Sequence, residues 1–467
     1  MSNNNIANRN IGFFQKFIVA ILSLLPVLGH ISITTIKLFG ITLTPYRVFI
    51  PLIFFYFLFM NLKNGWSEFL LNLKRKYGKY NVFFVITFLA FMIYGLILLF
   101  LAPMVDKRAG LFELINIGLG FLMIINIFEI SFIEGGLKLW LKILKIVFFI
   151  ILSLGFIEII MGFHLPFSRY SDPEILRYFS LQEKIINIAT GLYYNENDYS
   201  AFIVLFSPIV LFKVNKKCRL LNFLGLTLIS IVVSLNDSWI CIIALLIGIL
   251  FWVFLEKFSL KKIVLYLGNI IISHTIISSL LARFINKLND YRYKKAKIGL
   301  DQSRKFRPKK VVGAIEKVQQ QFDAANSKMG SLHQRTNTYL SSSLEMFTQT
   351  YGLGFGPGSF GNVIKQMDQP NLLLNPHCLW IEILVQYGLI IFVLFVLFIL
   401  SLFVHIIKKY REKPHSLLSF VLTMDLVFVF VAFSSSSWLN SPLIWIPIGL
   451  SLIMTRKDIN VLLDDFS

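Results

Sequence analysis

Apolar runs of nearly membrane-spanning length recur along the whole of this chain. A bilayer core is about 30 Å thick, so a helix needs about 20 apolar residues to cross it. Hydrophobic residues make up 56% of the sequence and charged residues only 15%, whereas about a quarter of a soluble protein is charged. These features exclude a soluble globular protein and predict an all-α polytopic membrane protein. About twelve spans are expected at that length, several of them short: Phe13–Ile31, Pro45–Leu62, Val82–Met104, Leu111–Phe132, Ile146–Phe163, Ser200–Phe212, Leu220–Leu235, Ile240–Leu255, Ile263–Leu281, Leu379–Val404, Leu417–Phe433 and Leu443–Met454.

Lysine and arginine collect in short connections between these runs. Cytoplasmic loops of membrane proteins carry such an excess. If the chain crosses twelve times, every cluster falls on one side, which places both termini in the cytoplasm. The sequence thus predicts nine spans in residues 1–281, and three more spans with a short cytoplasmic tail in residues 377–467. The clusters are Lys74-Arg75-Lys76, Lys213 to Arg219, Lys257 to Lys262, Lys408 to Lys413 and Arg456-Lys457.

One long hydrophilic segment, residues 282–376, is left for the opposite face. It is strongly basic: between Arg283 and Arg335 there are 14 Lys or Arg and 4 acids, out of a net charge of +20 for the chain. Loops longer than about 60 residues escape the charge rule, so this loop is expected outside the cell. Its partners would be phosphates of a lipid-linked substrate, membrane lipid headgroups or acidic wall polymers, and not nucleic acid. A cytoplasmic location is the alternative, and it would reverse the pattern of the short loops.

Metal, disulfide and nucleotide signatures do not occur in recognisable form. Cys218, Cys241 and Cys378 have no paired spacing, and the one adjacent acid pair, Asp464-Asp465, lies in the tail. A metal-dependent enzyme acting on diphosphates would need a carboxylate pair at its active face. The chain also lacks a Walker glycine loop, which disfavours ATP-driven transport. No cofactor is therefore expected.

The second half of the long loop carries the most distinctive pattern. Apolar residues recur at helical spacing from Thr338 to Gln349, and Tyr351-Gly352 is expected to end that helix. Gly354, Gly356 and Gly358 then permit backbone turns that other residues resist. Two interpretations are open for this turn. It is either a plain tight turn or a place where the backbone approaches a glycan or phosphate.

Several motifs occur here in a fixed order. Arg335-x-Asn337 is followed by the glycine turn of residues 352–360, and then by Asn375-Pro376-His377-x-x-Trp380-x-Glu382-Ile383-x-x-x-Tyr387-Gly388. Earlier in the chain stand Thr44-Pro45-Tyr46-Arg47 and the run from Gly191 through Asn197-Asp198-Tyr199-Ser200-Ala201. This ordered set resembles the O-antigen ligase and polysaccharide polymerase superfamily, and the resemblance covers most of the chain.

The resemblance implies a metal-independent glycosyltransferase with GT-C-like architecture in a bacterial plasma membrane. Its substrate would be a glycan carried on undecaprenyl diphosphate, transferred to a glycan acceptor hydroxyl on the outer face. Elementary chemistry agrees, because a neutral histidine can take the acceptor proton and guanidinium groups can bind the leaving diphosphate. His377 is the candidate general base and Arg335 the candidate diphosphate ligand. Further candidates for substrate binding are Arg47, Arg283, Asn197, Gly354, Gly356 and Gly358.

Plainer interpretations accompany these assignments. His377 could simply cap the helix that follows it, and Arg335 could be a solvated loop charge. The chain also departs from the family at two positions: Cys378 replaces an asparagine, and Trp239 replaces an arginine after Asn236-Asp237-Ser238, where Asp237 and Ser238 could be an ordinary helix cap. Intramembrane acids such as Glu158 and Asp425 are costly and could be functional.

Three functions remain open at this stage. The first is a polysaccharide polymerase that joins lipid-linked repeat units of a capsular, exopolysaccharide or teichuronic-acid-like polymer. The second is a ligase that transfers a finished glycan to another acceptor with the same residues. The third is a flippase or transporter of lipid-linked glycans, although transporters usually bind their substrates near the bilayer midplane.

Overall fold

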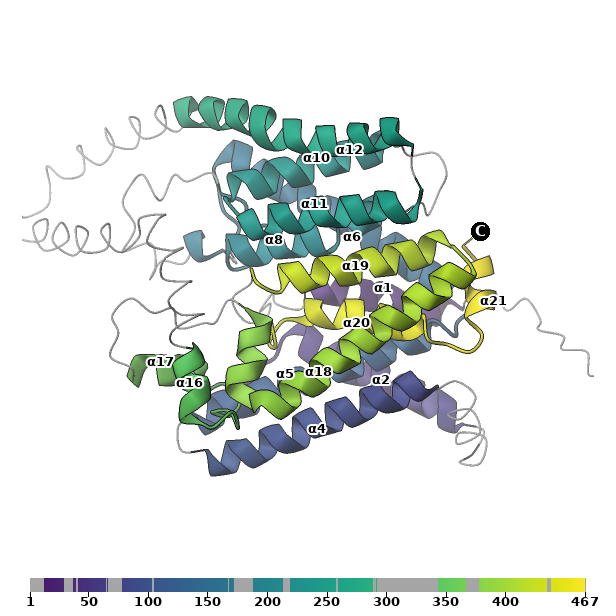
Figure 1. Cartoon of the computed structure of the whole chain (residues 1–467), viewed down its shortest axis with the longest axis vertical. Coiled ribbons are helices and arrows are strands. Elements are labelled where there is room, and N and C mark those ends of the chain that lie inside the picture. Colours follow the sequence, from purple (N-terminus) through teal and green to yellow (C-terminus); the bar gives the residue numbers. More distant parts are fainter. Residues whose placement is uncertain are drawn as a thin grey trace, which may run out of the picture.

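The computed structural model is a bundle of helices that run side by side, with short elements at both ends (Figure 1). It describes residues 12–28, 37–38, 41–63, 65, 78–102, 105–166, 168–171, 188–212, 219–257, 259–288, 291, 343–366, 378–434 and 438–466. The only strands in these ranges are β1 (Lys37–Leu38) and β2 (Ile41–Thr42), which pair antiparallel with Leu38 opposite Ile41.

Helices make up most of the described residues. Those of the first half are α1 (Phe13–Leu28), α2 (Pro45–Leu62), α4 (Lys79–Leu101), α5 (Lys107–Ile130), α6 (Gly136–Met161), the short 3₁₀ turn η1 (Arg169–Ser171), α8 (Glu196–Leu205) and α9 (Pro208–Leu211). Those of the second half are α10 (Arg219–Leu235), α11 (Trp239–Leu255), α12 (Leu260–Ile272), the π-turn η3 (Ser273–Ile277), α16 (Ser343–Gln349), α17 (Phe360–Gln366), α18 (Leu379–Glu412), α19 (Ser416–Val431), η6 (Pro442–Ile444), α20 (Trp445–Ile453) and α21 (Ile459–Asp464).

Six described helices are long and apolar enough to cross a membrane, which confirms the expected class of a helical membrane protein. They are Pro45–Leu62, Lys79–Leu101, Lys107–Ile130, Gly136–Met161, Leu260–Leu288 and Leu379–Glu412. Shorter apolar helices, such as Trp239–Leu255 and Ser416–Val431, lie among them. Each of the twelve predicted spans overlaps a helix, because length and apolar composition are strong signals.

Three predicted boundaries differ from the structure for local reasons. The sixth span divides into α8 and α9, because Pro208 cannot continue a helix through its nitrogen and instead starts a new one. The ninth span was expected to end at Leu281, but its helix continues through η3 to Leu288. Within α18, Gly388 has φ of 75° and ψ of 179°, so the first nine residues form a separate segment that turns across the bundle (Figure 1).

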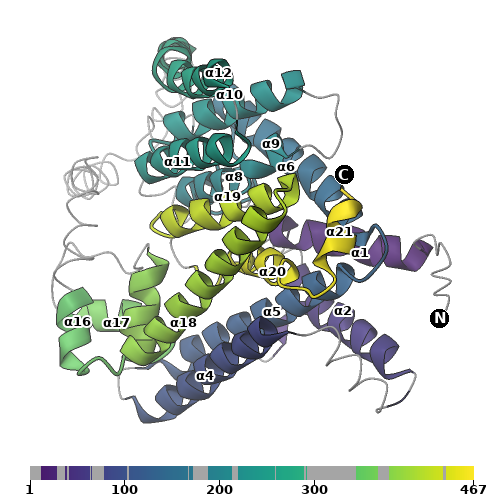
Figure 2. The same cartoon turned by 45° about the vertical axis from the view of Figure 1, so that its right-hand side comes forward.

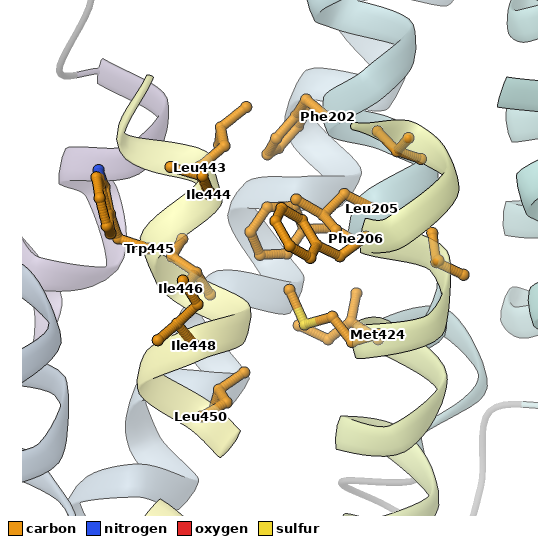
Figure 3. Packing of buried hydrophobic residues seen from close by; sticks show 14 of the residues in the cluster. Phe202, Leu205, Phe206, Met424, Leu443, Ile444, Trp445, Ile446, Ile448 and Leu450 are labelled. Atoms are coloured by element: carbon orange, nitrogen blue, oxygen red, sulfur yellow. The ribbon is translucent and has the colours of Figure 1, made fainter. Parts of the chain in front are cut away.

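A central core is formed where α8, α19 and α20 meet. Figure 3 shows Phe202, Leu205 and Phe206 lying between Met424 of α19 and the Ile444–Ile448 region, and all of these side chains are at most 6% exposed. Close packing of this kind lets the short helices α8 and α20 sit inside the bundle, where the longer helices surround them.

The two ends of the bundle carry different elements. At one end, here called the α16 end, α16 and α17 lie beside the first turns of α18, as both views show (Figures 1 and 2). The opposite end, here called the α21 end, holds α21 and the C terminus. There Arg456 binds the backbone and hydroxyl of Ser131, pairs with Asp458, and lies 3.8 Å from the ring centroid of Phe132. Arg456 therefore ties the C-terminal segment to the turn between α5 and α6.

Candidate functional site

The motif Thr44-Pro45-Tyr46-Arg47 forms the start of α2. Thr44 is the N-cap, and its hydroxyl accepts a hydrogen bond from the Arg47 backbone N–H at 3.4 Å. Pro45 occupies the first helical position, where its fixed φ suits the helix. Tyr46 is buried against the core. This local structure directs the half-buried Arg47 side chain toward α5.

Arg47 joins a chain of polar side chains from three parts of the protein. Its Nη2 donates to Asn116 Oδ1 at 3.3 Å, and Asn116 Nδ2 donates to Asn440 Oδ1 at 2.7 Å. Asn116 lies nine residues after the start of α5, which is about 14 Å along the helix at 1.5 Å per residue. Arg47, which bonds to Asn116, is thus recessed from the α16 end. Asn440, at the other end of this chain of side chains, is exposed.

Arg47 and a second arginine, Arg108, both lie near the ring of Phe112. The Phe112 ring centroid is 5.9 Å from the guanidinium carbon of Arg47 and 5.8 Å from that of Arg108. Arg108 is exposed near the start of α5, next to Lys107. The N-cap of this helix is Asp106, whose carboxylate accepts from the Arg108 and Ala109 backbone N–H groups. The two guanidinium groups lie near one ring, so positive charge extends from the exposed start of α5 at the α16 end to the recessed Arg47.

The start of α18 is fixed by contacts with α19 and with the loop before α20. The Leu379 N–H donates to the carbonyl of Ala432 at 2.9 Å, and Trp380 Nε1 donates to the carbonyl of Val429 at 3.3 Å. Glu382, 2% exposed, accepts from the backbone N–H groups of Trp438 and Leu439 at 3.1 and 3.4 Å. These bonds hold the start of α18 against α19 and against the loop before α20.

Two consecutive loop residues bring the arginine chain and the start of α18 together. Leu439 is bound by Glu382, and its neighbour Asn440 is bound by Asn116, which binds Arg47. We call this set of four side chains, Arg47, Asn116, Asn440 and Glu382, the α2–α18 junction. It links residues more than 300 positions apart in the sequence, and it joins Arg47 of α2 to α18 through α5 and the loop before α20.

The glycine turn packs against the break in α18. The Phe355 and Gly356 N–H groups donate to the carbonyls of Val385 and Gln386 at 2.9 and 2.8 Å, and the Leu389 N–H donates to the Gly352 carbonyl at 2.8 Å. Gly354 has φ of +90°, and a Cβ there would lie 2.6 Å from the Gln386 carbonyl oxygen. A Cβ on Gly358 would lie 2.8 Å from the backbone of Ala109.

The close approaches of Gly354 and Gly358 are therefore to the protein's own backbone. Gly356 makes a similar approach, to the Val105 side chain. The tight-turn interpretation accounts for all three, because each has a positive φ and no room for a side chain.

Glu113 ties this turn to α5. Its carboxylate accepts from the Tyr387 hydroxyl at 2.7 Å, and the Gly358 N–H and the Gln386 side chain also bond to it. Glu113 is 3% exposed and Tyr387 is fully buried. One buried carboxylate thus holds the glycine turn, the break in α18 and α5 together, as buried charges require.

The run from Gly191 to Ala201 forms a second, purely internal network. Tyr199 packs into a space that only glycine leaves open, since a Cβ on Gly155 would lie 2.1 Å from its hydroxyl. Asn195 and Asp198 form a reciprocal cap at the start of α8 through bonds of 2.9 and 2.7 Å. Asn197, a predicted substrate ligand, lies half-buried in the first turn of this helix.

Glu158 and Asn236 also act as internal braces. The Glu158 carboxylate accepts from the backbone N–H groups of Leu165, Thr190 and Gly191. The Asn236 amide forms two bonds of 2.9 Å with the backbone of Ala189. Both residues join loops to helices, and the three backbone donors satisfy the buried Glu158 carboxylate.

Asp425 is held in a similar way, by the Ser451 hydroxyl at 2.7 to 2.8 Å.

The structure describes the surroundings of Trp239 and Cys378, the two positions at which the sequence differs from the pattern that it resembles. Ser238 is the N-cap of α11 but makes no capping bond through its side chain, and Asp237 has φ of 57°. Trp239 is 62% exposed, and its ring lies 5.7 Å from that of His274 in η3. Cys378 is 1% exposed, and burial raises the pKa of its thiol to about 11.

The histidine and the arginines that the sequence predicts in the site fall into three groups. His377 and Arg335 lie outside the described residues, as do Asn337, Asn375 and Pro376. Arg47 lies in the α2–α18 junction. Arg283 is exposed on the continuation of α12, which both views place across the molecule from α2 and α4, so the structure does not bring it to Arg47 (Figures 1 and 2).

Arg108 and Asn116 were not predicted from the sequence as site residues. The signal that would have found them is their spacing on α5, since Arg108, Phe112 and Asn116 follow one another at every fourth position. Within the ranges that the structure describes, no three His, Cys, Asp or Glu side chains are grouped so that they could hold a metal ion.

Comparison with known proteins gave no relative, since no protein-family model and no curated protein matches the sequence.

Proposed function

We propose that the protein is a membrane glycosyltransferase, of the polysaccharide polymerase type, which joins glycan repeat units carried on undecaprenyl diphosphate. The observation that supports it is the α2–α18 junction, where hydrogen bonds through Asn116 and the loop residues Leu439 and Asn440 link Arg47 to Glu382 near the start of α18. That helix begins two residues after His377, so one network joins a basic group to the helix that follows the proposed base, over 300 residues away in the sequence. Such an arrangement suits a diphosphate leaving group beside an acceptor hydroxyl.

In this proposal all twelve apolar helices or helix pairs cross the membrane. Helices shorter than about 17 residues can still contribute, because longer helices surround them and shield them from lipid. The α21 end, with Lys138, Lys262, Lys409, Lys413 and Lys457, is cytoplasmic by the charge rule. The α16 end is then extracytoplasmic, and the architecture is of the GT-C-like kind.

The proposed chemistry assigns different groups to the two halves of the reaction. His377 takes the proton of the acceptor hydroxyl as oxygen attacks the anomeric carbon, and the bond from that carbon to the diphosphate oxygen breaks. Arg47 and Arg108 neutralise the charge that develops on the diphosphate, with Arg335 as a further ligand. Glu382 keeps the start of α18 in place and so acts as a positioning residue.

The test of this function is the intermediate that builds up in cells lacking the protein. A missing polymerase leaves single repeat units on the lipid carrier, already on the outer face and open to an added glycosidase. Long carrier-linked polymer would instead show a ligase, and single units protected inside the cell would show a flippase. Either of those two results contradicts the proposal.

Complementation with variants assigns the residues. Arg47→Lys keeps the charge but loses the planar fork, and it should reduce polymer formation by about 10-fold or more. His377→Ala should reduce it by about 100-fold, the usual contribution of a positioned base. Lys365→Ala, an exposed cation in α17 at the same end, is the matched control and should behave as the unmodified protein does. Equal polymer formation by all three variants would remove these assignments.

A further inference from the structure

A cavity lies at the α21 end of the bundle, between α10, α11 and α12. Its volume is about 520 Å³, within the range of about 300 to 1,000 Å³ that is typical of ligand sites. Its walls are apolar in one part, with Phe223, Trp252 and Leu265, and polar in another, with Asn222, Glu256 and Lys262. The glycosyltransferase function proposed above uses none of these residues.

The polar wall contains two hydrogen-bond acceptors whose side-chain oxygens have no partner in the part of the chain that the structure describes. Asn222 is 6% exposed, and its Oδ1 accepts no hydrogen bond. Glu256, half-buried just after the end of α11, forms neither a hydrogen bond nor an ion pair through its carboxylate in the same ranges. A buried acceptor without a donor costs about 1–3 kcal/mol, so Asn222 calls for a hydrogen-bond donor, and the half-buried Glu256 carboxylate in the same wall adds a negative charge.

The cavity lies at the depth of lipid headgroups. Asn222 is three residues after the start of α10, Lys262 is two residues after the start of α12, and Ser416 is the first residue of α19. One helical turn is about 5.4 Å, so the polar wall is within about a turn of the helix ends.

The surface around the cavity is apolar and open to the side. Leu220 is 72% exposed, Leu224 is 47% exposed, and Leu265 is 54% exposed. Such side chains at the edge of a membrane helix bundle face acyl chains rather than water. An occupant must therefore have an apolar body as well as a polar head.

We infer that this cavity binds a phospholipid whose headgroup carries a primary ammonium group. The ammonium donates to Asn222 Oδ1 and to the Glu256 carboxylate, the Lys262 ammonium lies beside the lipid phosphate, and the acyl chains lie along Leu220, Leu224 and Leu265. Charge complementarity decides the class of lipid, because Glu256 matches the positive ammonium and Lys262 matches the negative phosphate of a zwitterionic headgroup. This inference is independent of the glycosyltransferase function.

The test uses three lipids that differ in methylation of the headgroup amine and a fourth lipid that has no amine. Detergent-purified protein is titrated with phosphatidylethanolamine, its N,N-dimethyl form, phosphatidylcholine and phosphatidylglycerol, and bound lipid is counted by native mass spectrometry. We expect phosphatidylethanolamine to bind at least about 10-fold more tightly than phosphatidylcholine, whose trimethylammonium group cannot donate hydrogen bonds. Phosphatidylglycerol, which lacks the ammonium, should also bind weakly. Equal binding along the series, or a preference for phosphatidylglycerol, would overturn the inference.

Two variants then locate the site. Asn222→Leu and Glu256→Gln should each reduce the preference for phosphatidylethanolamine to less than about a third of its original ratio, the loss expected from a single hydrogen bond or charge. Glu412→Gln, an exposed carboxylate at the same end, is the matched control and should keep the full preference. If the preference survives both site variants, the lipid binds elsewhere and the assignment is wrong. The lipid series on the unmodified protein decides the matter even if a variant fails to fold.

Discussion

At the scale of single residues, the glycine turn shows most clearly why these amino acids are needed. Gly354, Gly356 and Gly358 all have positive φ, and their close neighbours belong to α18, to α4 with Val105, and to α5, respectively. A side chain at Gly354 would have to share space with the backbone of Gln386 and Gly388. The turn therefore depends on glycine for packing, whatever ligand approaches the α16 end.

Gly354→Ala should destabilise the protein by about 1–3 kcal/mol, because alanine resists this φ and meets backbone that cannot move aside. Thermal unfolding of the purified protein measures the change. Gly268→Ala is the control, since a Cβ at Gly268 in α12 would meet nothing within 4 Å. It should change stability by less than about 1 kcal/mol. An equal effect of both substitutions would contradict the packing described here.

Cys378 should be chemically inert in the folded protein. Burial raises the pKa of its thiol to about 11, so at pH 8 only about one molecule in 1,000 carries the reactive thiolate. In a Cys218→Ser background, maleimide labelling of Cys378 at pH 8 should require unfolding, and Cys241, also buried, should behave alike. Labelling that is complete within minutes in the native protein would show that the start of α18 is open.

At the scale of elements, α18 is best understood as two segments joined at Gly388. The first segment, residues 379–387, carries Trp380, Glu382 and Tyr387, and each of them bonds to a different neighbouring part of the protein. The second segment is one of the long apolar helices. The break lets one helix both run through the bundle and present its start at the α16 end.

Tyr387→Phe should weaken this arrangement, because it removes a donor from the buried Glu113 carboxylate. A loss of about 1 kcal/mol is expected, at the lower end for a buried hydrogen bond since such bonds in membrane proteins are modest. The free energy of unfolding in detergent measures it. Tyr351→Phe, at a position 94% exposed, should have no effect. Identical stabilities of all three proteins would show that the bond to Glu113 contributes little.

Much of this element scale could be predicted from the sequence, and the reasons for success and failure are physical. Apolar length located the helices, and the helix predicted up to Gln349 is confirmed as α16 over its described residues, Ser343–Gln349. The break at Gly388 could not be predicted, because its partner, the turn at Gly352, lies far away in the sequence. Arg108 was missed for the same reason, since its relation to Arg47 exists only when α2 packs on α5.

At the scale of the whole molecule, the proposal requires that the two ends of the bundle lie on opposite sides of the membrane. Tyr351 marks the α16 end and Val461, 68% exposed in α21, marks the other. In cells expressing single-cysteine variants, Tyr351→Cys should react with a membrane-impermeant maleimide, and Val461→Cys should react only after the cells are opened. The reverse pattern would invert the orientation, and equal reactivity in intact cells would contradict a bundle that separates two compartments.

We propose that this protein forms glycosidic bonds on carrier-linked glycans, and reconstitution of the purified protein is the decisive test of that function. Purified protein in liposomes is given the carrier-linked repeat units that accumulate in cells lacking it, with EDTA present and no nucleotide. We expect longer glycan chains and free undecaprenyl diphosphate in matching amounts, with a rate reduced by about 100-fold in His377→Ala and little changed in Lys365→Ala. Repeat units that cross the bilayer but never grow longer would contradict the account.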